Sequence, residues 1–324
     1  GDFFMVSIED KIVLSSCCCS SRFDDGYEML EWIAQLGFKQ VELSHGISIH
    51  LVPGILQAVE DGVISVASVH NFCPLPMGIR SPMPNLFKPS SRSKAELRLW
   101  SRYTLETFDF AQRVQAKKVV MHSGSVWFFF QSPVPRLIGW IDQSNLEESE
   151  LSSNSDFIAL RDKVMAKIKR SSNKHYKILK ESFASIVDTV KERGIELGIE
   201  NREGFSELPL DADHAEFVKN FSLKEPSPIR YWHDAGHAEI KVLYGLLDHE
   251  ARLIEMKDFL TGFHLHDVSE SGRDHQEIGT GIIDFNMLAH HIDVDKHTLV
   301  LELSPSLKID ALLRSRDYLL NCLS

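Results

Sequence analysis

The feature that most constrains this 324-residue chain is a repeated alternation of short apolar runs with helical patterns. Eight runs have the length of β-strands and are rich in Val, Ile or Leu, as expected for parallel strands that are buried on both faces. Eight such units separated by helices favour a closed (β/α)8 TIM barrel of the α/β class over an open doubly wound sheet. The predicted strands span residues 12–19, 40–45, 64–72, 117–123, 195–201, 229–235, 263–268 and 297–304.

The segments between these runs carry helical patterns with recognisable ends. Residues 25–37 place apolar residues on one stripe, and Gly37 fits a helix stop. Neither an interdomain linker nor an internal repeat is visible, so we expect one barrel domain over residues 1–324, in which residues 1–10 are a processing remnant or an N-terminal extension. The other predicted helices span residues 95–116, 175–193, 211–221, 239–260, 284–292 and 308–322.

Two segments are longer than simple barrel loops. Residues 74–94 follow the third strand and hold five of the 12 prolines. Residues 124–174 form an excursion after the fourth strand, and the stretch 161–180 carries eight Lys or Arg residues and one acidic residue. Both segments leave the carboxyl ends of strands, which is the catalytic face of such a barrel. We expect a lid or substrate clamp, although a solvated surface helix is the simpler interpretation of the charge run alone.

The composition argues against several classes of protein. Asp and Glu outnumber Lys and Arg by 46 to 35, and the net charge of −11 disfavours a general nucleic-acid or anionic-membrane surface. No apolar run approaches the ~18 residues of a membrane span, and the first residues do not resemble a signal peptide. Five cysteines, three of them consecutive, make a poor disulfide framework, so we expect a cytoplasmic protein. We interpret the aromatic segment 127–130 as a hydrophobic plug or a homo-oligomer contact rather than a sugar-stacking platform.

Residues that can bind a metal stand at the ends of six consecutive predicted strands. Imidazoles and carboxylates without thiolates suit Zn²⁺, Mn²⁺, Co²⁺, Fe²⁺ or Mg²⁺. Carboxylates buried together on successive strands would repel one another without a cation, which favours a metal site over a structural role. The strongest candidates are Glu200, Asp234, His264 and Glu302, joined by His70, His122, His237, His266, Asp274 and His275.

The remaining histidines are interpreted as structural, because a single histidine at a strand end is more often a hydrogen-bonded core residue than a ligand. His233 neighbours Asp234, but strand alternation points it away from the site. Glu42 either lines the lower part of the site or forms a core ion pair. The other histidines in this group are His45, His50, His175, His214, His249, His290, His291 and His297.

Six motifs together resemble the xylose isomerase-like TIM barrel superfamily, which contains sugar and sugar-phosphate isomerases and epimerases as well as type IV apurinic endonucleases. The motifs are SVHNF, VVMHSGS, GIENREG, HDAGH, FHLHD followed by GRDHQEIGTGIIDF, and VLELS. The resemblance implies a metal held by Glu200, Asp234, His264 (or His266) and Glu302, with the two glutamates also acting as acid and base. An endonuclease-type metal cluster would add His70, His122, His237, His275 and an acid near Asp274. Asp274 and His275 are adjacent, however, where the endonuclease pattern has one residue between them.

Three functions are compatible with this resemblance. The first is a divalent-metal-dependent sugar or sugar-phosphate isomerase or epimerase, in which the number of ions is open. Here the metal would bind substrate oxygens, and Glu200 and Glu302 would transfer a proton through an enediolate. Hydroxyls would be held by His70, His122, His266 and Asp274, and a phosphate by Arg202 with help from residues 161–180.

The alternatives differ from this function in partner and chemistry. One is a zinc-cluster phosphodiesterase of the apurinic endonuclease type, for which Arg80, Lys88, Arg92 and Lys94 would supply part of a DNA footprint. The other is a non-catalytic metal-binding barrel, since fold alone does not fix function.

Overall fold

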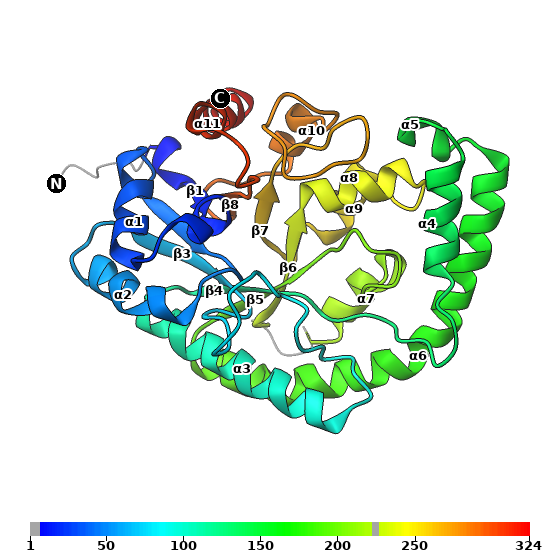
Figure 1. Ribbon diagram of the computed structural model, residues 1–324, viewed down its shortest axis with the longest axis horizontal. Coiled ribbons are helices and arrows are strands. Elements are labelled where there is room, and N and C mark those ends of the chain that lie inside the picture. Colours follow the sequence, from blue (N-terminus) through cyan, green and yellow to red (C-terminus); the bar gives the residue numbers. More distant parts are fainter. Residues whose placement is uncertain (1–6, 222–226) are drawn as a thin grey trace.

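The computed structural model describes residues 7–221 and 227–324, so residues 1–6 of the expected N-terminal extension lie outside the described residues. Eight parallel strands, each paired with the next and β8 with β1, close a barrel (Figure 1). The predicted (β/α)8 TIM barrel is therefore confirmed. The strands are β1 (Ile12–Ser15), β2 (Gln40–Leu43), β3 (Ser65–His70), β4 (Lys118–Met121), β5 (Glu196–Glu200), β6 (Ile229–Asp234), β7 (Leu260–Leu265) and β8 (Thr298–Leu301).

Most strands lie within the predicted runs but are shorter. β1 ends at Ser15, where the Ser15 hydroxyl accepts the N–H of Cys17 at 3.3 Å and starts a 3-10 turn that contains two of the three consecutive cysteines. β7 begins three residues before the predicted run, and His266 lies just beyond its end. The 3-10 helices are η1 (Glu9–Lys11), η2 (Ser16–Cys18), η3 (Ser20–Arg22), η4 (Ile49–Leu51) and η5 (Asp211–Asp213).

The helices surround the barrel, and several begin at an aspartate whose side chain accepts backbone N–H groups of the first turn, as at Asp25, Asp234 and Asp284. The sequence pattern missed α2 and merged α8 with α9, which are separated by a turn at residues 244–248. The helices outside the excursion after β4 are α1 (Gly26–Gln35), α2 (Val52–Glu60), α3 (Lys94–Arg113), α7 (His214–Lys219), α8 (Ala235–Leu243), α9 (His249–Met256), α10 (Phe285–His290) and α11 (Ile309–Leu323).

The excursion after β4 is helical rather than a loop. It contains α4 (Val134–Gln143), α5 (Glu148–Leu151) and the first part of α6 (Ser155–Glu192), a helix of 38 residues. The predicted helix 175–193 thus begins twenty residues earlier, because the basic stretch 161–180 also carries buried apolar residues at helical spacing. Figure 1 shows α4, α5 and the start of α6 extending beyond the barrel on the right, and we call residues 124–174 the arm.

The interior of the barrel is filled midway along the strands, below their carboxyl ends. Trp232 packs there with Val13, Val120 and Val300 and is fully buried. A Cβ atom added at Gly262 would lie 2.4 Å from the Trp232 ring, so this position has room only for glycine. Above this plug the carboxyl ends of the strands stay open, and this is the face that carries the active site in TIM barrels. No helix among the described residues has the length and apolar character needed to cross a membrane.

Candidate active site

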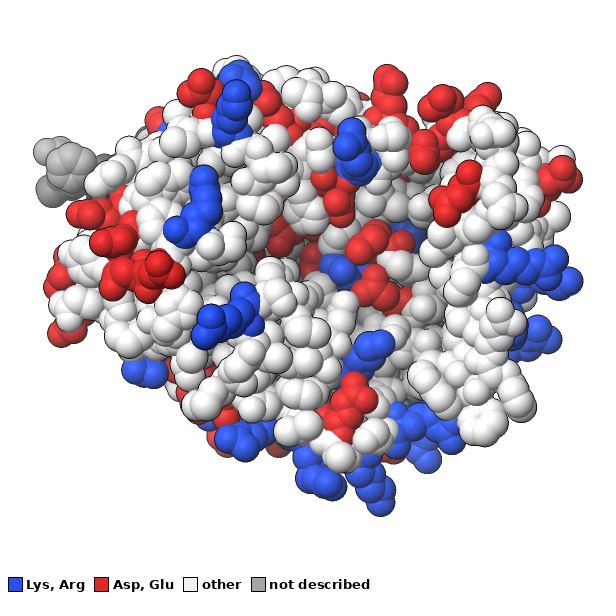
Figure 2. Space-filling view, viewed as in Figure 1, with Lys and Arg blue, Asp and Glu red and all other residues white. Residues whose placement is uncertain are grey.

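A pocket of about 410 Å³ opens at the carboxyl ends of the strands, and most of its lining comes from the segments that directly follow the strands. Figure 2 shows it as a central hollow in which red carboxylates surround a blue side chain. Pro82 and Pro84 bring the segment 74–94 to its edge, whereas no residue of the arm lines it. Only the first of the two long segments is thus placed to cover a substrate. The polar lining includes His45, His70, His122, Glu200, Arg202, Glu203, His237, Asp274, His275 and Glu302.

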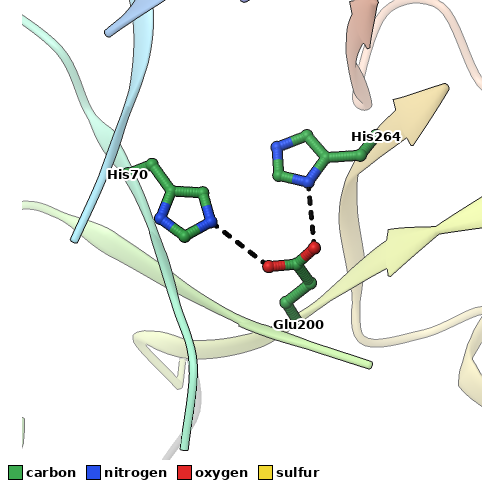
Figure 3. A group of neighbouring side chains, drawn as sticks. All are labelled: His70, Glu200 and His264. Atoms are coloured by element: carbon green, nitrogen blue, oxygen red, sulfur yellow. Dashed lines mark hydrogen bonds and ion pairs between the residues drawn. The ribbon is translucent and has the colours of Figure 1, made fainter. Parts of the chain in front are cut away.

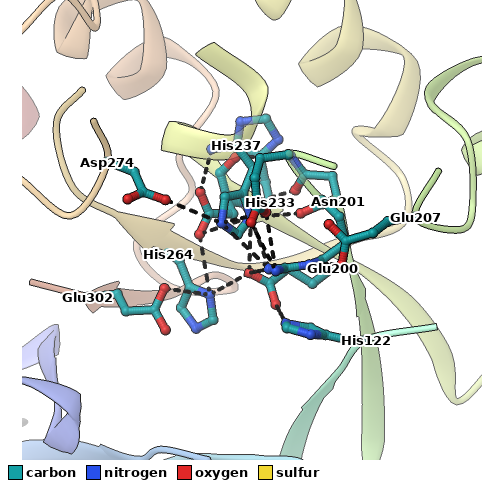
Figure 4. A network of polar contacts seen from close by, with 12 residues as sticks. His122, Glu200, Asn201, Glu207, His233, His237, His264, Asp274 and Glu302 are labelled. Carbon is teal, nitrogen blue, oxygen red and sulfur yellow. Dashed lines mark hydrogen bonds and ion pairs between the residues drawn. The ribbon is translucent and has the colours of Figure 1, made fainter. Parts of the chain in front are cut away.

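Four of the predicted ligands converge on one point at the base of this pocket. Glu200, Asp234, His264 and Glu302 offer one ligand atom each, and the four atoms lie within 4.8 Å of one another. Nδ1 of His264 lies 3.1 Å from Glu200 Oε1, 3.8 Å from Asp234 Oδ2 and 3.4 Å from Glu302 Oε2. Figure 3 shows the contacts of Glu200 with His264 and His70, and Figure 4 shows the wider network. The structure therefore brings together the set that the sequence singled out.

The strand register explains this convergence. Asp234 of β6 stands opposite His264 of β7, and His264 stands opposite Val300 of β8, two residues before Glu302. Asp234 also caps α8, because its Oδ1 accepts the backbone N–H of His237 at 2.7 Å. The strand thus passes into the helix without a loop, which fixes the aspartate at the rim.

The carboxylates around His264 are buried close together, and their negative charges favour a positive charge among them. Glu42, Glu200, Asp234 and Glu302 are at most 4 % exposed, and Glu42 Oε1 contacts His264 Nε2 from below at 2.9 Å. Burial lowers the pKa of His264, but the carboxylates of Glu302, Glu42 and Glu200 outweigh burial and raise this pKa well above its usual value. Burial likewise raises the pKa of Glu200, yet His122 and His264 outweigh burial and hold the pKa of Glu200 well below its usual value.

This donor set fits a divalent cation. Four buried carboxylates surround one imidazole, and carboxylate oxygen with imidazole nitrogen is a ligand combination that Zn²⁺ and Mn²⁺ accept. Two further groups of possible ligands border it, His70–Glu200–His264 and His266–His275–Glu302. Because they share members with the first group, the donor set alone does not fix the number of ions.

Histidines line the opposite wall of the pocket. His122 Nε2 lies 2.8 Å and His70 Nε2 3.2 Å from Glu200 Oε2. Burial, with Arg202 nearby, lowers the pKa of His122 to about 4, although Glu200 opposes this shift. The ring of His45 stands 4.6 Å from that of His70, and its Nδ1 is buried without a hydrogen-bond partner in the described part of the chain. From the sequence, His45 was predicted to be structural. It stands two residues beyond the end of β2, however, and a position just after a strand end is what identified the other residues of the rim.

Arg202 is held by carboxylates on three sides. Its Nε donates to Glu207 Oε1 at 3.1 Å, one terminal nitrogen lies 3.1 Å from Glu203, and the other lies 3.6 Å from Glu200. Burial lowers its pKa, but Glu207, Glu203 and Glu200 outweigh burial and raise the pKa. The guanidinium that was expected to hold a phosphate is therefore already neutralised by protein groups.

The remaining predicted residues form the rim on the side of β6 and β7. His237 Nε2 lies 3.2 Å from Glu203 and 4.0 Å from Asp274, and His275 bridges Asp274 at 3.0 Å and Glu302 at 3.4 Å. These groups line the pocket as expected. His266, predicted to bind substrate, lies behind Asp234 instead.

His266 is fully buried, and both of its ring nitrogens are engaged. Its Nε2 contacts Asp234 Oδ1 at 3.0 Å, and its Nδ1 accepts the N–H of His275 at 2.9 Å. A Cβ atom added at Gly236 would lie 2.0 Å from the His266 ring, so glycine in the HDAGH motif makes this packing possible. The neighbouring Asp267, which sequence reasoning missed, accepts four backbone N–H groups at 2.9 to 3.1 Å and holds the loop that carries His275; they belong to Val268, Gly279, Gly281 and Ile283.

Comparisons with known proteins match most of the chain. A family model described as xylose isomerase-like TIM barrel matches residues 30–319. Among solved structures, a D-tagatose 3-epimerase-like protein has a TM-score of 0.66 at 15 % identity over 96 % of both chains. The 3-keto-D-glucoside 4-epimerase of E. coli has a TM-score of 0.65 at 14 % identity, over 96 % of this chain and 98 % of its own. A D-psicose 3-epimerase crystallised in the presence of D-fructose has a TM-score of 0.60 at 15 % identity over 96 % of both chains. A comparison with curated protein sequences finds no match.

Proposed function

The chain belongs to the xylose isomerase-like TIM barrel family, and from this premise we propose that it is a divalent-metal-dependent isomerase or epimerase of a free sugar. The observation that carries the proposal is the pair of buried carboxylates, Glu200 from β5 and Glu302 from the end of β8, which contact the same His264 nitrogen at 3.1 and 3.4 Å. Two carboxylates on either side of one small pocket can exchange a proton with opposite faces of a bound substrate. The structural neighbours named above are sugar epimerases, which agrees with this chemistry.

The two glutamates would divide the proton transfer between them. One carboxylate removes the proton from the carbon next to the carbonyl, and the electrons of that C–H bond form an enediolate. The other carboxyl group then delivers a proton to the opposite face, which gives epimerisation, or to the neighbouring carbon, which gives isomerisation. His275 lies 3.4 Å from Glu302, so its imidazole is placed to exchange a proton with that carboxyl group.

The other polar residues of the pocket would bind and orient the sugar. His70 and His122 hold one oxygen of Glu200 and keep its second oxygen toward His264, while His45 and Asp274 are placed to meet sugar hydroxyls. A divalent metal held by Glu200, Asp234, His264 and Glu302 would supply Lewis-acid polarisation of the substrate carbonyl.

A free sugar fits the pocket better than a sugar phosphate. Arg202 is the only Lys or Arg side chain among the described residues that line it, and this guanidinium is already paired with Glu207 and Glu203. The carboxylates of Glu203, Asp274 and Glu302 would repel a phosphate group. The pocket volume of about 410 Å³ lies at the lower end of the ~300–1,000 Å³ range of small-molecule sites.

The phosphodiesterase alternative keeps its ligands but lacks the expected footprint. Lys88 donates to the Ser125 hydroxyl at 2.9 Å, and Arg92 lies over the Trp127 ring. None of the four cations expected to form the footprint is among the described residues that line the pocket. A DNA backbone that approached the pocket would meet carboxylates instead. We therefore place this activity second.

The test measures solvent exchange into sugars. Protein reconstituted with Mn²⁺ or Zn²⁺ is incubated in D2O with D-psicose, D-fructose or D-tagatose, and deuterium entering next to the carbonyl is followed by NMR. Glu302→Gln is expected to slow exchange by about 10²–10⁴-fold, the usual contribution of general acid–base catalysis. The matched control is Glu106→Gln, an exposed glutamate paired with Arg102 on α3, and it is expected to exchange at the wild-type rate.

Two outcomes would contradict the proposal. Full activity of Glu302→Gln would remove this glutamate from the mechanism. Absence of exchange with every sugar, combined with EDTA-sensitive cleavage of an oligonucleotide that contains an abasic site, would assign the site to phosphodiester hydrolysis.

A further inference from the structure

A row of exposed aromatic rings begins where β4 leaves the barrel. Trp127, Phe129 and Phe130 are 55 %, 74 % and 86 % exposed. None of them lines the pocket at the carboxyl ends of the strands. Single exposed apolar side chains are common on protein surfaces, but several large ones side by side typically mark a binding surface.

The backbone that presents these rings is firmly held. Val126 donates its N–H to Ser206 at 2.8 Å, and Trp127 donates its N–H to Nε2 of His175 at 3.2 Å. His175 is buried on α6, and its Nδ1 donates to the Ser90 carbonyl at 2.8 Å. The backbone is therefore held up to Trp127, at the start of the row of rings.

A cleft of about 400 Å³ lies between this segment and α6, and cations surround it. Its lining includes the four cations Arg92, Lys167, Arg170 and Lys174, and no carboxylate of the described ranges 7–221 and 227–324 contributes to it. Figure 2 shows blue side chains gathered along the lower and right edges of the molecule, over α6. The chain as a whole has a net charge of −11, so this local excess of positive charge has the opposite sign to the charge of the whole chain.

The cations already lie against the aromatic faces. The Arg92 guanidinium lies 5.7 Å from the centroid of the Trp127 ring, and the Lys167 ammonium lies 5.9 Å from that of Phe128. Aromatic faces can stack on a planar ring, and Arg and Lys bind phosphate oxygens. The cleft thus offers both kinds of contact side by side.

We propose that this aromatic–cationic cleft binds a small ligand that carries both an aromatic ring and a phosphate group, as a mononucleotide does. The planar base would stack on Trp127 or Phe129, and the phosphate would meet Arg170 and Lys174. A concave site of about 400 Å³ matches a small molecule. A polymer or an anionic bilayer would be repelled at long range by the acidic remainder of the surface.

The test uses AMP, adenosine and inorganic phosphate as separate probes, with binding measured by isothermal titration calorimetry and by quenching of tryptophan fluorescence. AMP is expected to bind at least tenfold more tightly than either of its halves. The double variant Arg170→Ala/Lys174→Ala is expected to lose at least tenfold in AMP affinity. The matched control Lys177→Ala/Lys180→Ala removes the same charge from the same helix outside the cleft and is expected to keep the affinity.

A second pair of variants separates stacking from charge. Phe129→Ala/Phe130→Ala removes two exposed rings, and circular dichroism verifies that the fold is retained. Weaker AMP binding in this variant, with unchanged binding of phosphate, supports the proposal.

Several results would overturn it. One is the absence of AMP binding at millimolar concentration, and another is equal affinity for AMP and inorganic phosphate. AMP binding that survives in the Arg170/Lys174 variant would place the nucleotide elsewhere. Two further outcomes, each observed without AMP binding, would assign the rings to another partner. Sedimentation with vesicles of anionic lipid that depends on Phe129 and Phe130 would indicate a membrane. Self-association that depends on the same two residues would indicate a second copy of the chain.

Discussion

The two ends of the barrel interior differ sharply although the same four strands build both. Each of β5 to β8 places two inward-facing residues one pleat apart: Gly198 and Glu200, Trp232 and Asp234, Gly262 and His264, Val300 and Glu302. Among the first members, Gly198, Gly262 and Val300 pack against Trp232, whereas the four second members form the candidate metal-binding group. A step of two residues, about 7 Å along a strand, thus separates packing from chemistry.

This difference shows how the charged end is tolerated. Buried carboxylates in contact are costly, and a well-packed plug beneath them keeps the strands in register regardless of their repulsion. The comparison predicts that changes to the lower residues alter stability first, whereas changes to the upper residues alter metal binding and activity first.

The largest expected effect on stability comes from removing the plug. Trp232→Ala leaves a cavity lined by Val13, Val120 and Val300 and should lower the free energy of unfolding by about 3–5 kcal/mol. Urea denaturation followed by circular dichroism measures this change. A loss below about 1 kcal/mol, within the range of ordinary surface changes, would show that the lower end is not what holds the barrel.

The second prediction concerns the cation at the upper end. Metal at 100 times its dissociation constant should raise the free energy of unfolding by about 2.7 kcal/mol, because it binds only the folded chain. The measurement is thermal unfolding with Mn²⁺ or Zn²⁺ and with EDTA. In Glu302→Gln the same metal concentration should stabilise the protein much less, since one ligand of the group is neutral.

Trp232→Ala provides the matching control for this experiment. The Trp232 ring packs on that of His264, with 5.3 Å between the centroids, but the variant keeps all four candidate ligands, so its metal-induced increment should exceed that of Glu302→Gln. The opposite result, in which metal stabilises Glu302→Gln against unfolding but does not stabilise Trp232→Ala, would contradict the assignment of metal binding to the upper residues.

The sequence predicted which residues meet at the upper end, because histidines and carboxylates at strand ends form a distinctive pattern. His70, Glu200, Asp234 and Glu302 each stand at or directly after the end of a strand, and parallel strands bring such ends together. Glu42 and His45 belong to the same pattern on β2, but a single carboxylate or histidine on one strand does not distinguish a site residue from a core residue.

The packing that supports the site left almost no trace in the sequence. Gly198 and Gly262 accommodate the Trp232 ring from two neighbouring strands, and only the register shows that all three meet. The basic stretch 161–180 was interpreted as a solvated surface helix, and it does lie on a helix. The charge run did not reveal that buried side chains such as Val164 and Ile168 recur between its eight cations, nor that the helix begins at Ser155.

The smallest expected effect on stability comes from Gly236, where packing and chemistry meet. The added methyl group of Gly236→Ala would collide with the His266 ring, which supports Asp234. Overpacking of this kind costs about 1–3 kcal/mol, and the better helix propensity of Ala returns up to ~1 kcal/mol, so the net loss of stability should be about 1–2 kcal/mol. Metal affinity should fall as well, because His266, which orients the candidate ligand Asp234, is displaced.

Gly139→Ala on α4 is the control: a Cβ there meets nothing within 4 Å, so the variant should gain stability and keep its metal affinity. Unfolding curves and metal titrations of both variants decide the matter, and unchanged metal affinity in Gly236→Ala would mean that His266 does not position Asp234.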